Sequence, residues 1–126
     1  ARDGAPTVVA TAPRLDDGTP FPTFYYLTHP ELVAGISTLE ADGVMRELND
    51  LLEADESLRD AYRAAHEAYL RDRAAVGHVD EVDGISAGGM PVRVKCLHAL
   101  AAHALAAGPG VNPVGDIALA RLDRLP

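Results

Sequence analysis

A long alanine-rich segment near the C-terminus constrains the fold more than any other part of the sequence. Residues 91–107, PVRVKCLHALAAHALAA, are largely apolar, and glycines flank them on both sides. Proline is favoured in the first turn of a helix, and the Gly-Pro-Gly at 108–110 ends one. The pattern therefore predicts one helix over 91–107. Alanines allow neighbouring helices to approach closely, so we expect this helix to be the central, buried one.

Two short segments near the N-terminus predict strands. Residues 7–12 (TVVATA) and 23–28 (TFYYLT) are rich in β-branched and aromatic residues. The intervening PRLDDGTPFP contains Asp17-Gly18 and three prolines. This combination is typical of two antiparallel strands joined by a long, stiff turn. Because two strands alone are only marginally stable, helices must cover one face of the pair.

The sequence LTHPEL at 27–32 marks the start of a helix. Thr28 and Glu31 have the spacing of a capping box, and the two leucines occupy the positions of a hydrophobic staple. Proline is tolerated in the first turn that follows. We expect this helix over 29–42, with Gly43 at its end.

Apolar residues at helical spacing predict further helices. One covers 44–54, and another begins after Asp55 and carries a charged outer face. Asn112 or Asp116 is expected to cap a last short helix. Two strands followed by helices indicate the α+β class: a small antiparallel β-hairpin or sheet packed against four to five α-helices, mostly helical. A chain of 126 residues suffices for a single domain over 1–126.

Residues 77–89, GHVDEVDGISAGG, contain four glycines and three acids. A segment of this length and composition is typical of a mobile loop, either a lid or a disordered connection. The chain begins Ala-Arg-Asp without methionine, so we expect an N-terminal segment to be missing.

Composition excludes several classes of function. The net charge is 11 − 19 = −8, which disfavours nucleic acid and anionic membranes as partners. A single cysteine excludes an internal disulfide and suits a reducing compartment, so we expect a cytoplasmic protein. The apolar runs are shorter than the roughly 20 residues of a membrane helix.

The predicted 91–107 helix carries the candidate metal ligands. Cys96 and His103 lie on one otherwise apolar stripe, so the simplest interpretation is a buried core face. On a continuous helix Cys96 and His98 point to nearly opposite sides, and no pair on this helix has the i, i+4 spacing that lets two ligands converge. A metal site for one Zn or another soft divalent ion would therefore need a ligand from elsewhere, and His29 is the best candidate.

The same segment supports an anion-binding interpretation. Arg93 and Lys95, the only lysine, fall in the first turns of the predicted helix, where the backbone also favours an anion. No Asp or Glu occurs between Gly84 and Gly115. Arg14 in the hairpin turn is a third candidate. The alternative is that these cations pair with distant acids.

Two further interpretations are weaker. Cys96 is a candidate nucleophile only if its surroundings are exposed and electropositive. GPGVNPVGD at 108–116 lacks the phosphate-loop motifs, and a helix end followed by a helix start explains its glycines and prolines. Asn112 and Asp116 are its candidate ligand-binding groups.

Three segments together, PRLDDGTPFPTFYYLTHPELV, GMPVRVKCLHALAAHALA and GPGVNPVGD, are similar to a bacterial family known as domain of unknown function 501. The resemblance implies a small cytoplasmic protein whose genes lie near those of exopolyphosphatase-type phosphatases. It also implies that the position of His29 is often cysteine, which makes His29, Cys96 and His98 a potential soft-metal or redox constellation. Histidine at this position disfavours an iron–sulfur cluster, because cysteine thiolates usually hold those.

The sequence thus predicts a small-ligand site, for a phosphate-type anion or a metal ion, where the hairpin turn, the start of the 29–42 helix and the 91–107 helix meet. An alternative is an enzyme acting on a phosphorylated small molecule, with His98 as general acid or base. A further alternative is an interaction module that regulates a partner enzyme through its acidic helices at 44–76. The sequence leaves open whether the protein is an enzyme.

Overall fold

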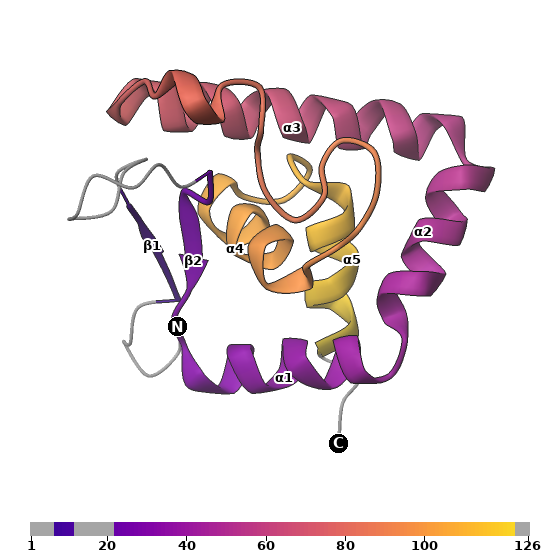
Figure 1. The fold of residues 1–126 in the computed structure, drawn as a ribbon. Coiled ribbons are helices and arrows are strands. Elements are labelled where there is room, and N and C mark those ends of the chain that lie inside the picture. Colours follow the sequence, from indigo (N-terminus) through magenta and orange to yellow (C-terminus); the bar gives the residue numbers. More distant parts are fainter. Residues whose placement is uncertain (1–6, 12–21, 123–126) are drawn as a thin grey trace.

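A computed structural model describes residues 7–11 and 22–122, and these residues form a two-stranded sheet and five α-helices (Figure 1). The elements, in chain order, are β1 (Val8–Ala10), β2 (Tyr25–Leu27), α1 (Pro30–Ala41), α2 (Val44–Ala54), α3 (Glu56–Val76), the 3-10 helix η1 (Asp80–Val82), α4 (Leu97–Ala107) and α5 (Pro113–Leu122). The α+β, mostly helical class is confirmed. Within the described ranges, no helix has both the length and the apolar character needed to cross a bilayer.

The sheet is antiparallel, as predicted. Val8 pairs with Leu27, and Ala10 pairs with Tyr25. Both strands are shorter than the segments 7–12 and 23–28 that the sequence suggested, and β2 packs against α4. The turn that carries Arg14 lies outside the described residues.

Helices α1, α2 and α3 form three sides of a frame around α4 and α5, and the two strands close the remaining side (Figure 1). In α4 every residue from Leu97 to Ala104 except His98 is buried, which confirms the prediction of a central helix. Its contact with α5 is very close, because a Cβ atom on Gly115 would lie 2.2 Å from the carbonyl oxygen of Leu100. Glycine is therefore needed where these two helices meet.

The helix starts follow local capping signals, with one shift. α1 begins at Pro30, and its N-cap is His29, whose Nδ1 accepts a hydrogen bond from the N–H of Glu31. The predicted capping box, with Thr28 as the N-cap, is therefore wrong by one residue. Asp55 caps α3, and the side chain of Asn112 accepts a hydrogen bond from the first turn of α5, as predicted.

The prediction that a helix starts at Pro91 is wrong. Gly88 and Gly89 adopt left-handed backbone conformations, with φ of 67° and 94°. A Cβ on Gly89 would lie 2.6 Å from the carbonyl oxygen of Arg93, so the turn folds the chain closely onto itself. The carbonyl of Gly88 accepts the N–H of Lys95 at 2.7 Å. These contacts hold residues 91–96 in a turn and an extended segment, and α4 begins only at Leu97.

Residues 77–89 pack against the body of the protein at several points. The buried guanidinium of Arg73 donates hydrogen bonds to three backbone carbonyls, those of Pro22, Val82 and Ile85. Ser86 is buried, and its hydroxyl lies 2.7 Å from His66 Nδ1. One arginine on α3 thus joins this segment to the residues before β2. The mobility of the segment stays a prediction.

Candidate functional site

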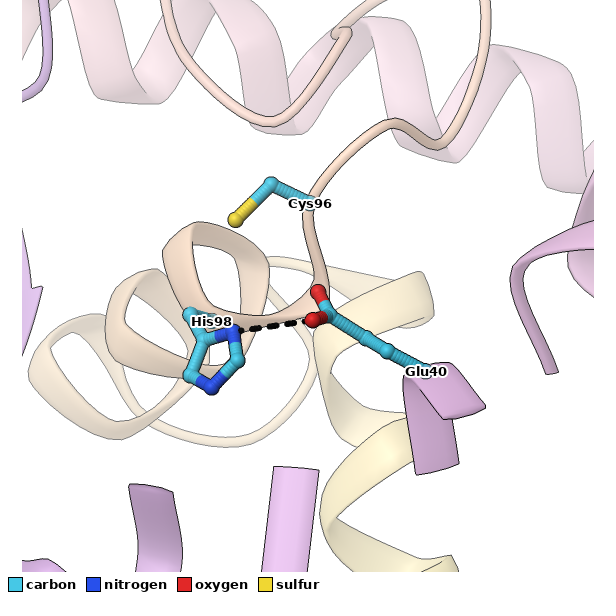
Figure 2. A group of neighbouring side chains, drawn as sticks. All are labelled: Glu40, Cys96 and His98. Carbon is cyan, nitrogen blue, oxygen red and sulfur yellow. Dashed lines mark ion pairs between the residues drawn. The ribbon is translucent and has the colours of Figure 1, made fainter. Parts of the chain in front are cut away.

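Three side chains of metal-ligand type meet where the end of α1 faces the start of α4. Glu40 lies in the last turn of α1, Cys96 is the N-cap of α4, and His98 lies in its first turn. One ligand atom from each residue lies within 4.8 Å of the other two (Figure 2). All three are partly buried, with side chains 24% exposed for Glu40 and 28% for His98. Solvent and a small ligand can therefore reach the cluster.

The two carboxylate oxygens of Glu40 have different partners. Oε2 accepts a hydrogen bond of 2.9 Å from the N–H of Leu97, the first residue of α4. Oε1 lies 3.3 Å from His98 Nδ1. The first amides of a helix lack partners within the helix, and negative charge is favoured at that end. Glu40 therefore holds the two helices together and fixes the position of the imidazole ring.

The other ring nitrogen of His98 faces α1. Its Nε2 lies 3.1 Å from Ser37 Oγ and 3.3 Å from the carbonyl oxygen of Val33. Ser37 and Glu40 lie one turn apart on the same face of α1, so a single helix surface contacts both nitrogens. Contacts to both nitrogens thus fix the ring, and its Nδ1 faces the side chain of Glu40.

The convergence of Cys96 and His98 corrects the expectation that they point apart. That expectation required one continuous helix through both residues. Cys96 instead has extended backbone, with φ of −147° and ψ of 110°, and only His98 is helical. The break between them lets the thiol and the imidazole approach one another. Glu40 was not predicted; the signal was its spacing from Ser37 (i, i+3), which places these two polar side chains on one face of α1.

Two predicted metal ligands do not join this cluster. His29 caps the opposite end of α1 from Glu40. His103 is fully buried deeper along α4, where its Nδ1 accepts a hydrogen bond of 3.1 Å from the Asn112 side chain and its ring stacks on Tyr25. Burial lowers the pKa of His103 below its ordinary value, against the smaller opposing effect of nearby carboxylates. Its Nε2 has no hydrogen-bond partner among the described residues.

The predicted anion-binding residues lie before α4, not in its first turns. Arg93 and Lys95 are exposed, and neither forms an ion pair with a described acid. Arg93 lines a concavity together with Arg59 and the acids Asp50 and Glu53. The first amide of α4 is already bonded to the carboxylate of Glu40. Anion binding by these residues stays a prediction, and Arg14 lies outside the described residues.

The remaining candidates have structural explanations. Asn112 caps α5, and a carboxylate oxygen of Asp116 accepts the N–H of Gly110 at 2.9 Å, which fixes the loop between α4 and α5. In the described part of 30–76, the exposed large apolar side chains are Leu51 and Val76. They lie on different helices, with Val76 at the end of α3 farthest from α2 (Figure 1), so they do not form the contiguous patch that an interaction module would need.

Together the fold and the cluster define a small, mostly helical α+β protein with a partly buried group of Cys, His and Glu side chains between two helices. The chain belongs to the family described as Protein of unknown function (DUF501), whose model matches residues 1–120. The resemblance seen in the sequence is thereby confirmed. Searches of curated proteins and of solved structures found no match.

Proposed function

We propose that the protein binds one divalent metal ion, best fitted by Zn²⁺, through Glu40, Cys96 and His98. The observation that carries the proposal is the approach of their three ligand atoms to within 4.8 Å of one another. Thiolate, imidazole and carboxylate are the three side-chain types that bind zinc in proteins. Harder ions such as Mg²⁺ and Ca²⁺ prefer oxygen ligands alone, so the thiol favours a softer metal.

The distance between His98 and Glu40 supports this assignment. Zn–N and Zn–O bonds of about 2.0–2.2 Å at a tetrahedral angle separate the two ligand atoms by about 3.4 Å. His98 Nδ1 and Glu40 Oε1 are 3.3 Å apart. Two of the three ligands are therefore already at the separation that a tetrahedral ion requires. The Cys96 thiol would supply the third ligand, since its sulfur lies within 4.8 Å of a ligand atom of each of the other two residues.

The surroundings of His98 also suit a ligand that binds through Nδ1. Metal-binding histidines usually donate the other ring N–H to a carbonyl or carboxylate, which orients the ring. His98 Nε2 has the carbonyl oxygen of Val33 at 3.3 Å for this purpose. Three protein ligands leave the fourth position of a tetrahedral ion open, as in catalytic zinc sites. A reduced thiolate ligand fits a cytoplasmic location.

The test is the metal content of protein purified without a metal-affinity column, measured by inductively coupled plasma mass spectrometry before and after incubation with Zn²⁺ and desalting. We expect about one Zn²⁺ per chain, as for a specific site. Cys96→Ser and His98→Gln should lose it, whereas His29→Ala should retain it. His78→Gln is the matched control, because His78 is an exposed histidine beside Asp80, away from the cluster.

Binding should also raise the thermal stability of the wild type. A ligand at one hundred times its Kd stabilises the folded state by about 2.7 kcal/mol. Cys96→Ser should show no such rise, while His78→Gln should match the wild type. If the wild type binds no Zn²⁺, or if Cys96→Ser and His98→Gln bind as much as the control, the proposal is wrong.

A further inference from the structure

Glu40 and His98 also belong to a second arrangement, which includes Ser37. Ser37 Oγ lies 3.1 Å from His98 Nε2, and His98 Nδ1 lies 3.3 Å from Glu40 Oε1. A hydroxyl, an imidazole and a carboxylate therefore follow one another through the two nitrogens of one ring. This order of nucleophile, base and orienting group defines catalytic triads, which are recognised by geometry and not by sequence position.

The partners of the ring are compatible with the tautomer that such a triad needs. A carboxylate can only accept, so the Nδ1–H form donates to Glu40 and leaves Nε2 as an acceptor for the Ser37 hydroxyl. The Val33 carbonyl does not require the Nε2 proton, because it is four residues before Ser37 and has its helical partner there. In this form Nδ1 donates to Glu40 and Nε2 accepts from Ser37, and the contact of 3.3 Å between Nε2 and the Val33 carbonyl is not a hydrogen bond. The Ser37 hydroxyl proton consequently points at a base.

We propose that in the metal-free protein Ser37 is a nucleophile, activated by His98 and acting on small acyl esters. Ser37 is exposed on α1, so an ester can reach it from solvent. Its Oγ forms a bond to the acyl carbon while its proton passes to His98 Nε2. The C–O bond of the ester then breaks, and the alcohol leaves with that proton. Water, deprotonated by Nε2, attacks the acyl-serine and releases the carboxylic acid and the free hydroxyl.

The expected reactivity is moderate. General-base assistance contributes about 10²- to 10⁴-fold. Ser37 lies within α1, where backbone amides are bonded along the helix, so the described residues beside it offer no ready pair of oxyanion donors. We therefore expect reaction with activated esters and phosphonylating reagents, which have good leaving groups.

Metal binding and nucleophile activation exclude one another. A metal on Nδ1 places the remaining ring proton on Nε2, which then cannot accept the proton of Ser37. Zn²⁺ should therefore suppress the reaction of Ser37. This inference shares Glu40 and His98 with the proposed metal site but does not require that a metal binds.

The experiment uses the full chain in EDTA with a fluorophosphonate probe, followed by intact-protein mass spectrometry and peptide mapping. Attack by Ser37 Oγ forms an O–P bond, breaks the P–F bond and releases fluoride, so each chain gains one phosphonyl group. We expect a single adduct on Ser37 that is absent in Ser37→Ala. This variant should fold normally, because Ser37 is exposed and alanine favours helix. Ser57→Ala, which changes an exposed serine on α3, should label like the wild type.

His98→Gln should slow labelling by about 100-fold or more, as expected for loss of a general base. Glu40 acts as a positioning residue, so Glu40→Gln should lower the maximal labelling rate without changing the half-saturating probe concentration. Labelling of Ser37 no faster than that of Ser57, or unchanged labelling in His98→Gln, would overturn the inference. If Zn²⁺ binds but Ser37 does not react, only this inference fails. If Ser37 reacts but no metal binds, only the metal proposal fails.

Discussion

Replacement of Asn112 by alanine should destabilise the protein more than the loss of an ordinary helix cap. Asn112 is fully buried between α4 and α5. Its Oδ1 accepts the N–H of Gly115 at 3.0 Å, and its Nδ2 lies 3.1 Å from His103 Nδ1. One side chain thus caps α5 and satisfies a buried imidazole. Both functions are lost in Asn112→Ala.

The lost cap and the lost hydrogen bond to His103 each lower the free energy of unfolding by their own amount. Removal of an N-cap side chain costs about 1 kcal/mol. A buried acceptor left without a donor costs a further 1–3 kcal/mol or so. His103 cannot find solvent instead, because it is fully buried and its Nε2 already has no partner among the described residues. We therefore expect a decrease of about 2–4 kcal/mol in the free energy of unfolding.

Urea unfolding followed by circular dichroism at 222 nm measures this difference. Asp55→Ala is the matched control, because Asp55 caps α3 through a bond of 3.0 Å to Leu58 but is exposed. The control should lose only about 1 kcal/mol. Equal losses in the two variants would refute the reasoning, since they would show that His103 is satisfied without Asn112.

Two further predictions concern other buried polar groups. Arg73→Met removes three hydrogen bonds to backbone carbonyls, so urea unfolding should show a free energy of unfolding lower by about 2–4 kcal/mol. Amide hydrogen exchange in residues 77–89 should become faster. Arg71→Met, on the exposed face of α3, is the control and should change neither quantity. Burial lowers the pKa of His103 and of His66 below the ordinary value of 6.5, so the unfolded chain binds protons first as the pH falls. The stability that the neutral histidines contribute is therefore complete above about pH 6.5 and is lost below it. Urea unfolding measured from about pH 7.5 to 5.5 should show the free energy of unfolding falling with pH, and falling less steeply in His103→Gln. An equal pH dependence in that variant would count against this prediction.

Much of the fold could be predicted because its signals are local. The bounds of α2, the cap of α3 at Asp55 and the cap of α5 at Asn112 depend on residues within a few positions of one another. Apolar spacing then shows which face of each helix is buried. The order of two strands before the helices was enough for the fold class.

The site could not be predicted in the same way, because it is formed by contacts between residues far apart in the sequence. α4 begins six residues later than predicted because Gly88 and Gly89 fold the chain against its own backbone and against the side chain of Leu100. That late start lets the thiol of Cys96 turn toward His98.

Glu40 reaches the N–H of Leu97 across 57 residues of sequence. Local signals were therefore enough to predict the fold class and most of the helices, and they suggested two of the three proposed ligands, Cys96 and His98. Only the packing of α1 against α4 decided that a carboxylate and a serine hydroxyl meet the same imidazole ring, because side chains on separate helices converge through tertiary contacts and not through spacing along the chain.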